Sequence, residues 1–223
     1  MKHTIISIEG NIGSGKSTLF EQLQHTFSNN PNIIFVREPV DIWENIRDED
    51  GTTILEKFYE NQVKYSFSFQ IMAYISRINL LKESINKAPH NSVIITERSL
   101  YTDKMVFAKM LYDTHKIECI NYQIYLNLFE TFKNDFYVDK VIYIKTDPDI
   151  CYNRILKRAR TGENNISLDY LDLCHEYHNN MIHELECDKI LLNGNVDIYE
   201  NSNQLNDWIC QIQEIIKTIK LLC

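Results

Sequence analysis

Residues 4–20 read TIISIEGNIGSGKSTLF and decide the fold. The segment Thr4–Ile8 is short, apolar and largely β-branched, which is typical of a buried parallel strand. A glycine-rich turn follows, and a helix is expected from about Lys16 to Phe27. The turn matches the pattern G-x-x-x-x-G-K-[ST] at every fixed position. Because a strand precedes it and a helix follows it, we interpret it as a P-loop rather than a chance glycine-rich turn.

The spacing of this motif follows from anion binding. Glycines let backbone N–H groups curl around an anion without Cβ clashes, and the following helix N-terminus adds favourable partial charge. A lysine at position 16 reaches the β- and γ-phosphates of a nucleotide, and a hydroxyl at position 17 can bind Mg²⁺. The residues expected to hold the triphosphate are Gly10, Asn11, Ile12, Gly13, Ser14, Gly15, Lys16, Ser17 and Thr18.

Length and composition limit the class of protein. The 223 residues, 44% of them hydrophobic, suit one α/β domain spanning 1–223 with a sizeable core. A net charge of −8 without a long basic run argues against a nucleic-acid polymer as partner, although local cations can still bind small anions. Neither a signal peptide nor an apolar run of transmembrane length is visible. The six cysteines form no C-x-x-C pair, so reduced thiols and a cytoplasmic location without membrane association are expected.

Strand-like and helix-like segments alternate along the chain. This order predicts an α/β fold with a five-stranded parallel sheet and helices on both faces. Residues 41–51 are polar and turn-rich, and a polar cap is expected before Pro148 at the start of a helix. Besides Thr4–Ile8, the expected strands are Ile33–Val36, Val93–Thr96, Val141–Lys145 and Lys189–Leu192. Further helical patterns cover Thr52–Lys87 (two helices broken near Gln62–Ser66), 100–112, 121–134, Ser167–Leu185 and Asn203–Leu221.

Two carboxylates follow predicted strands. Glu97 comes after Val93–Thr96 with Arg98 beside it, and Glu38 comes after Ile33–Val36. Ligands bind at the carboxyl ends of strands in open parallel sheets, so we expect Glu97 to bind Mg²⁺ and Arg98 to stabilise a phosphoryl group in flight. Glu38 is a candidate general base for a hydroxyl acceptor. The alternatives are a solvated charge pair for Glu97 and Arg98, and a plain turn residue for Glu38.

Arginines gather toward the end of the helix that begins at Pro148. Arg154 and Arg158 share a helix face, Arg160 follows, and a glycine-containing loop comes next. Guanidinium groups in this setting suit a lid that closes over phosphates and excludes water. We therefore expect an Arg-rich lid at about 154–168, with a solvated basic helix face as the alternative.

With these pieces in order, the chain resembles the deoxyribonucleoside kinases of the deoxycytidine/deoxyguanosine kinase type. The resemblance covers nearly the whole chain, and several marks in the correct order are more specific than the P-loop alone. These marks are Ile8–Gly13, Glu38-Pro39-Val40 with Trp43, Ser66–Gln70, Ser76-Arg77-Ile78, Glu97-Arg98-Ser99, Tyr101 with Asp103, and Arg154–Glu163.

The resemblance implies a P-loop kinase fold and transfer of a phosphoryl group from ATP, with Mg²⁺, to the 5′-hydroxyl of a deoxyribonucleoside. Glu38 looks like the family's base, Glu97 like its Mg²⁺-associated acid and Arg98 like its transition-state arginine. The family commonly forms homodimers through helices, for which the apolar faces of 66–87 and 121–134 are candidates unless they belong to the core.

The resemblance also implies the residues that hold the nucleoside. Gln70 looks like the residue that hydrogen-bonds the base edge, while Tyr59 and Glu163 look like ligands of the sugar 3′-hydroxyl. The apolar walls would be Trp43, Leu55, Phe58, Phe69 and Phe107. An aromatic stripe at helical spacing is, however, also typical of plain core.

Three positions suggest which base is accepted. Ala73, Arg77 and Asp103 match the set of members that take deoxycytidine and deoxypurines. An Arg–Asp pair occupies the space that a 5-methyl group needs and offers polar contacts to exocyclic groups. The expected substrates are therefore deoxycytidine, deoxyadenosine or deoxyguanosine rather than thymidine.

Other functions and one other site remain as alternatives. A deoxynucleoside monophosphate kinase on the same scaffold would need an extra cation, for which Arg37, Lys64 and Lys104 are candidates. The alternative of another class is a non-catalytic nucleotide-binding switch or regulatory subunit, and a switch is disfavoured since no N-K-x-D segment is present. Cys174, His175 and His178 are interpreted as ordinary polar positions of a helix rather than a zinc site, because four well-placed ligands are not visible.

Overall fold

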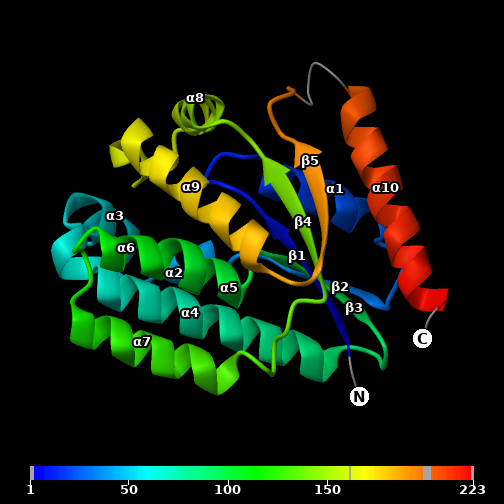
Figure 1. Cartoon of the computed structure of the whole chain (residues 1–223), viewed down its shortest axis with the longest axis horizontal. Coiled ribbons are helices and arrows are strands. Elements are labelled where there is room, and N and C mark those ends of the chain that lie inside the picture. The colour runs from blue at the N-terminus through cyan, green and yellow to red at the C-terminus, as the bar shows by residue number, and fades with distance from the viewer. Residues whose placement is uncertain (1–2, 161, 198–201, 222–223) are drawn as a thin grey trace.

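The computed structural model describes residues 3–160, 162–197 and 202–221. Within these residues, five parallel strands form one sheet in the order β2-β3-β1-β4-β5 (Figure 1). The strands are β1 (Thr4–Glu9), β2 (Ile33–Val36), β3 (Val93–Glu97), β4 (Lys140–Lys145) and β5 (Asp188–Asn193). The predicted α/β class and parallel sheet are therefore confirmed. Thr161 of the predicted lid and the predicted reduced thiol of Cys223 lie outside the described residues.

The central strand β1 places the P-loop in the middle of the sheet. It pairs with β3 on one side, where Ile6 lies opposite Ile95, and with β4 on the other, where Ile8 lies opposite Ile142. Because the strands are parallel, their carboxyl ends meet at one edge. The P-loop, the end of β3 and the segment after β2 therefore lie at the same edge.

Helices connect the strands and cover both faces of the sheet. They are α1 (Lys16–Thr26), α2 (Val40–Glu44), α3 (Ile54–Glu60), α4 (Gln62–Lys87), α5 (Leu100–Thr102), α6 (Lys109–Asp113), α7 (Cys119–Phe132), α8 (Pro148–Arg158), α9 (Leu168–Glu184) and α10 (Ser202–Leu221). A π-helical segment, η1 (Asp103–Ala108), joins α5 to α6, and a 3₁₀ turn, η2 (Glu163–Asn165), precedes α9.

Some local expectations were wrong. The break between the two helices of 52–87 falls at Asn61, before Gln62–Ser66, because the Asn61 side chain caps α4 by accepting from the backbone N–H of Lys64 at 3.1 Å. The turn-rich segment 41–51 contains most of the short helix α2. The side chain of Asp147 does not cap α8; its carboxylate accepts instead from the amide of Asn195 at 2.8 Å.

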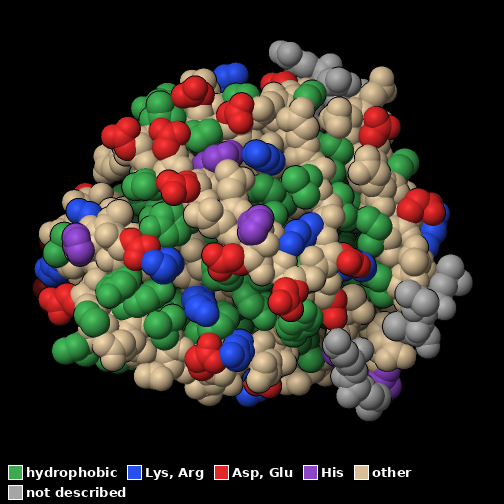
Figure 2. Space-filling view, viewed as in Figure 1, with side chains coloured by type: hydrophobic (Ala, Val, Ile, Leu, Met, Phe, Trp, Pro, Cys, Tyr) green, Lys and Arg blue, Asp and Glu red, His purple; other side chains and the backbone are tan. Residues whose placement is uncertain are grey.

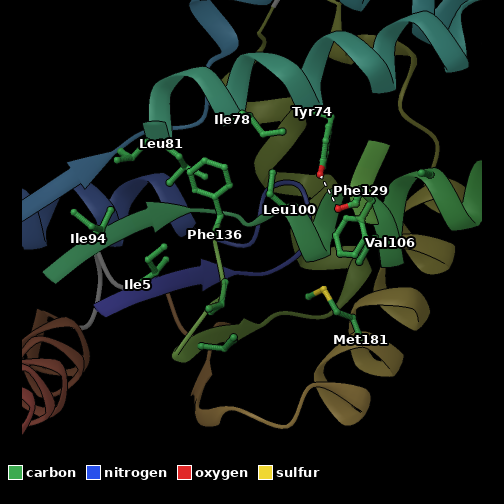
Figure 3. Close-up of a cluster of buried hydrophobic side chains, with 14 of the residues drawn as sticks. Ile5, Tyr74, Ile78, Leu81, Ile94, Leu100, Val106, Phe129, Phe136 and Met181 are labelled. Atoms are coloured by element: carbon green, nitrogen blue, oxygen red, sulfur yellow. Dashed lines mark hydrogen bonds between the residues drawn. The ribbon is translucent and has the colours of Figure 1, made fainter. Parts of the chain in front are cut away.

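The two largest clusters of buried apolar side chains lie one on each face of the sheet. Alternation along β1 sends Ile6 and Ile8 toward α1 and α10, and sends Ile5 toward α4, α7 and α9 (Figure 1). Figure 3 shows the cluster that contains Ile5, in which Tyr74 of α4 donates to the backbone carbonyl of Phe129 in α7 at 3.5 Å. Full burial of each large apolar side chain contributes about 1.5–3 kcal/mol, so both clusters hold the edge that carries the P-loop.

Among the helices of the described chain, none combines the length and apolar character that crossing a membrane requires.

Candidate active site

The P-loop is closely packed against its neighbours, and two of its positions leave no room for a side chain larger than that of glycine. A Cβ on Gly10 would lie 2.7 Å from the backbone oxygen of Ile144, and a Cβ on Gly13 would lie 2.6 Å from that of Cys151. Both glycines have positive φ, at 150° and 79°. The backbones of β4 and α8 therefore pack directly against the loop and stabilise its curved conformation.

Asn11 fastens the loop from within. Its side-chain NH₂ donates to the carbonyl of Leu171 in α9 at 2.9 Å, and its Oδ1 accepts from the N–H of Ile12 at 2.8 Å. Thr146, which follows β4, donates to the carbonyl of Ser14 at 3.1 Å. The loop is thus held in a phosphate-binding shape by polar contacts from α9 and β4.

Lys16 is buried at the centre of this edge. Its Nζ donates to the backbone oxygen of Asn11 at 2.7 Å, so the ammonium group already has an acceptor within the loop. Burial, followed by repulsion from Arg98, lowers the pKa of Lys16 to about 7, while Glu38 and Glu97 oppose the shift. An incoming anion therefore meets a lysine whose charge depends on pH near neutrality.

The two residues predicted to bind Mg²⁺ lie together. The Ser17 hydroxyl donates to Glu97 Oε1 at 2.5 Å across the start of α1 and the end of β3. Hydroxyl and carboxylate oxygens are the hard ligands that Mg²⁺ prefers, and the ion usually keeps several waters besides such protein ligands. The donor set therefore fits a magnesium ion beside the P-loop.

Glu38 is held between two arginines. Its Oε1 lies 3.1 Å from Arg77 Nη2 and 3.0 Å from Arg98 Nε, and 17% of its side chain is exposed. Burial alone would raise the pKa of Glu38, but Arg98, Arg77 and Lys16 together hold the pKa below its ordinary value. The carboxylate is therefore ionised at neutral pH and fixed in position.

Arg77 lies behind this carboxylate rather than in the pocket wall. Its Nε donates to Asp103 Oδ2 at 2.8 Å and its Nη2 to Asp103 Oδ1 at 3.2 Å, while Nη1 donates to the carbonyl of Glu97 at 2.8 Å. Burial would lower the pKa of Arg77, but the neighbouring carboxylates of Asp103 and Glu38 raise it above its ordinary value. Arg77 thus positions two carboxylates, Glu38 and Asp103, which both line the pocket, while Arg77 itself does not.

A pocket with aromatic walls and many polar lining groups opens beside Glu38. Phe58 and Phe69 stack with ring centroids 4.6 Å apart, and Trp43 meets Phe69 edge-on at 5.5 Å. The predicted wall residues Leu55 and Phe107 line the pocket too. The aromatic stripe is therefore both core and pocket wall, so the two interpretations of it were not exclusive.

Polar groups converge on this pocket. Gln70 is almost fully buried, and its amide makes no hydrogen bond with any described residue, so its donors and acceptor face the pocket unpaired. Burial, with the nearby charge of Glu163, raises the pKa of Tyr59, which keeps its phenol as a hydrogen-bond donor. A flat polar heterocycle with a hydroxylated substituent suits these groups.

The predicted lid lies over the pocket. Arg158 and Arg160 both form ion pairs with Glu163, the second at 3.4 Å. Ala159 between them adopts a left-handed conformation with φ 48°, which ends α8 and turns the chain toward the pocket. Arg154 points elsewhere and donates to the carbonyl of Ser14 at 3.4 Å, beside the P-loop.

Two pockets meet at the P-loop. Lys16, Ser17 and Arg158 line both of them. The first pocket holds Glu38 and the aromatic walls, and the second runs outward between the P-loop, α8 and α10. The second is lined by Gly13, Ser14, Gly15, Lys16, Ser17, Thr18, Arg154, Lys157, Arg158, Gly194, Val196, Asp197 and Trp208. Two substrates can therefore approach Lys16 from opposite sides.

Comparison with known proteins identifies this arrangement. The family model described as deoxynucleoside kinase matches residues 6–219. The chain belongs to the deoxynucleoside kinase family. It is 35% identical over 225 residues to a probable deoxycytidine kinase of Fowlpox virus (strain NVSL), covering 97% of this chain and 90% of that protein. It is 31% identical to deoxycytidine kinase 1 of Xenopus laevis (96% and 91% covered) and 34% identical to human deoxycytidine kinase (78% and 73% covered).

These matches confirm the predicted deoxyribonucleoside kinase and its reaction, phosphorylation of a nucleoside. They favour a catalytic protein over the alternative of a nucleotide-dependent switch. Kinases of this family use ATP as the phosphate donor.

Several residues of the kinase site were missed from the sequence. Val40 and Tyr170 line the acceptor pocket, and Trp208 lines the other pocket from α10. Val40 belongs to the Glu38-Pro39-Val40 mark of the resemblance, which could have indicated it. No local motif marks Tyr170 and Trp208, because each reaches the site only through tertiary packing. His178, interpreted as an ordinary polar position, is wholly buried against Arg98. The only indication in the sequence that His178 is buried was its position on an otherwise apolar face of the predicted helix.

We predict that triphosphate binding is coupled to proton uptake by Lys16. At about pH 8 most Lys16 side chains are neutral before binding, since their pKa is about 7, and the phosphates favour the ammonium form. Calorimetry of a non-hydrolysable ATP analogue in buffers of different ionisation enthalpy should show uptake of most of one proton per site. At about pH 6 the uptake by Lys16 should be small.

The matched control is Lys16→Arg, whose guanidinium stays charged at both pH values and should remove the pH-dependent part of the uptake. Equal proton uptake at both pH values in the unmodified kinase would contradict the prediction.

Proposed function

We propose that this enzyme transfers the γ-phosphoryl group of ATP to the 5′-hydroxyl of deoxycytidine, deoxyadenosine or deoxyguanosine in preference to thymidine. The observation that supports this most directly is the contact between Glu38 and Arg98, 3.0 Å apart, in the wall of a pocket that Lys16 also lines. The pocket wall thus contains both a carboxylate that can serve as base for the acceptor hydroxyl and cations that can bind the phosphoryl group.

Glu38 serves as the general base in this proposal. The proton of the 5′-hydroxyl moves to the Glu38 carboxylate as the hydroxyl oxygen attacks the γ-phosphorus, and the bond from that phosphorus to the β,γ-bridging oxygen breaks, so that ADP leaves. Phosphoryl transfer passes through a loose transition state, so a positioned carboxylate of modest basicity is sufficient. Arg98 and Lys16 stabilise the charge on the transferred group.

Mg²⁺ is the proposed metal, held by Ser17 and Glu97. When bound, it would supply positive charge that offsets the negative charge of the phosphates. The support is the 2.5 Å contact between the two oxygen donors at the P-loop.

The proposed orientation of the nucleoside uses both ends of the acceptor pocket. Gln70, whose amide has no partner among the described residues, would hydrogen-bond the base edge, and Asp103 would face the exocyclic groups. Tyr59 and Glu163 would hold the 3′-hydroxyl at the opening. The apolar walls exclude water from the base.

Residues 154–168 act as the lid of a single kinase unit that spans 1–223 in this proposal. Arg154, Arg158 and Arg160 would bind ATP phosphates as the lid closes. The supporting observation is that Arg154 and Arg158 line the pocket on the nucleotide side of the P-loop.

A monophosphate acceptor receives less support. Arg37 is half exposed and pairs with Glu21, Lys64 lies over the ring of Tyr65, and Lys104 lies over the ring of Phe129. None of these three candidate cations lines the acceptor pocket.

We also propose a homodimer formed through α4 and α7. Figure 2 shows hydrophobic side chains at the surface over these helices, at the lower left. A groove between the two helices is lined mostly by apolar side chains, among them Ile71, Ile75 and Ile124. Ile124 is 50% exposed and Ile120 70% exposed, which is costly on a free surface, and a second copy would cover both.

The proposed location is the cytoplasm. Cys119, Cys151, Cys174, Cys187 and Cys210 carry free thiols, the form expected in a reducing compartment.

We predict the acceptor order in a coupled assay of ADP release with the four deoxyribonucleosides and their monophosphates. Deoxycytidine, deoxyadenosine or deoxyguanosine should give the highest kcat/KM, because Asp103, which Arg77 holds in the pocket wall, suits their exocyclic groups. Thymidine equal to the best of them would refute the base preference. A monophosphate that exceeds every nucleoside would refute the acceptor class.

We predict that Glu38→Gln lowers kcat by roughly 10²–10⁴-fold while nucleoside binding is retained, because the amide cannot take the hydroxyl proton. Steady-state kinetics and nucleoside titration calorimetry measure the two quantities. Glu49→Gln, at an exposed position, is the control and should behave as the unmodified enzyme. An unchanged kcat in Glu38→Gln would remove the base from the mechanism.

We predict that the enzyme has twice the 26.4 kDa mass of one chain by light scattering, and that Ile124→Glu halves the measured mass. A charge in a buried apolar interface is destabilising. The control Leu191→Glu changes a residue that is 61% exposed on β5 and should leave the mass unchanged. A monomeric unmodified enzyme would exclude this interface.

A further inference from the structure

A buried histidine lies directly behind Arg98, outside the proposed catalytic set. His178 of α9 has no exposed surface, and its Nε2 lies 3.2 Å from Arg98 Nη1. Its other ring nitrogen, Nδ1, lies 2.6 Å from the backbone oxygen of Cys174 one turn earlier. Both nitrogens therefore have a partner at hydrogen-bond distance.

These partners define the protonation of the ring. A guanidinium group only donates, so Nε2 must accept from Arg98 and carry no proton. A carbonyl only accepts, so Nδ1 carries the proton and donates it to Cys174. Burial, followed by the charge of Arg98, lowers the pKa of His178 well below its ordinary value, which agrees with a neutral ring.

Aromatic rings fix the orientation of His178. Tyr143 of β4 lies nearly parallel to the imidazole, at 10° and 6.4 Å between centroids. Phe107 meets it edge-on at 6.1 Å and also carries the Arg98 guanidinium over its ring at 4.9 Å. His178 and Arg98 therefore share one rigid support.

The donors of Arg98 can be accounted for one by one. Nη1 has two N–H groups, which point to the backbone oxygen of Gly10 at 3.0 Å and to His178 Nε2. Nε lies 3.0 Å from Glu38 Oε1, with which it forms an ion pair. The two N–H groups of Nη2 have no partner among the described residues, and Arg98 lines the acceptor pocket. Only Nη2 is therefore free to bind a phosphoryl oxygen.

The backbone conformation of Arg98 gives its side-chain contacts a larger part in setting the direction of the guanidinium group. Arg98 has φ 66°, a left-handed conformation that a non-glycine residue rarely adopts, directly after β3. The side chain thus leaves the strand at an unusual angle, and its direction is set by the acceptors that it meets.

We propose that His178 is a positioning residue for Arg98: by accepting the second Nη1 hydrogen it turns the guanidinium so that Nη2 points at the transferred phosphoryl group. The inference rests on the proposed role of Arg98 in phosphoryl transfer. His178 touches neither substrate, so it acts only through Arg98.

A pair of amide variants tests this role. The amide of Gln at position 178 can reach the place of Nε2 and accept from Arg98, whereas Asn reaches only the place of Nδ1. We expect His178→Asn to lower kcat about tenfold with both KM values within about twofold, because a hydrogen bond to a charged group is lost in the transition state. His178→Gln should retain kcat to within about threefold.

The controls separate positioning from folding. Thermal unfolding should show similar melting temperatures for the two variants, since both bury an amide of similar polarity. Tyr143→Phe removes the hydroxyl that donates to Asn179 at 3.1 Å but keeps the ring against His178, so its kcat should be unchanged. Equal kcat in His178→Asn and His178→Gln, whether both high or both low, would overturn the proposal.

A double-mutant cycle links the effect to Arg98. In an Arg98→Lys background, which lacks Nη1, His178→Asn should lower kcat no further. If Arg98→Lys alone leaves kcat unchanged, both the proposed role of Arg98 in phosphoryl transfer and the positioning role of His178 are refuted. If Arg98→Lys lowers kcat but His178→Asn does so equally in both backgrounds, only this inference fails.

Discussion

Buried charges at the carboxyl edge of the sheet must be paired, and this requirement joins the reacting groups into one unit. Glu38 lies between Arg77 and Arg98, and Arg77 also holds Asp103. Removing one member of such a cluster leaves an uncompensated buried charge, which costs about 3–5 kcal/mol. The ends of β2 and β3, the middle of α4 and the start of η1 are therefore held in a single arrangement.

This cluster also couples recognition to chemistry. Asp103 lines the pocket wall, Glu38 lies beside the P-loop, and one guanidinium contacts both carboxylates. A substitution at Asp103 that displaced Arg77 would also alter the position of Glu38, because the Arg77 side chain contacts both carboxylates. Base preference and turnover are thus expected to change together when this pair is altered, even though Arg77 itself does not line the pocket.

On the phosphate side, protein groups act as partners for the cations. Lys16 donates to the carbonyl of Asn11, while Arg158 and Arg160 pair with Glu163. A bound triphosphate offers stronger acceptors to all three cations. In the proposed mechanism, exchange of these partners would release Glu163 to bind the sugar hydroxyl, which would couple binding at the P-loop to closure over the nucleoside.

The sequence by itself determined those features, the P-loop and the strands, that depend on residues close together in the chain. The P-loop follows from spacing, since Gly10 and Gly13 occupy positions where a Cβ would clash, and the strands follow from short apolar runs such as Val93–Thr96. Only the tertiary structure decided that Arg77 lies behind the pocket wall and that His178 accepts from Arg98 across 80 positions of the chain. The physical reason is that a backbone motif depends on neighbouring residues, whereas the partner of a buried charge depends on which distant elements pack against it.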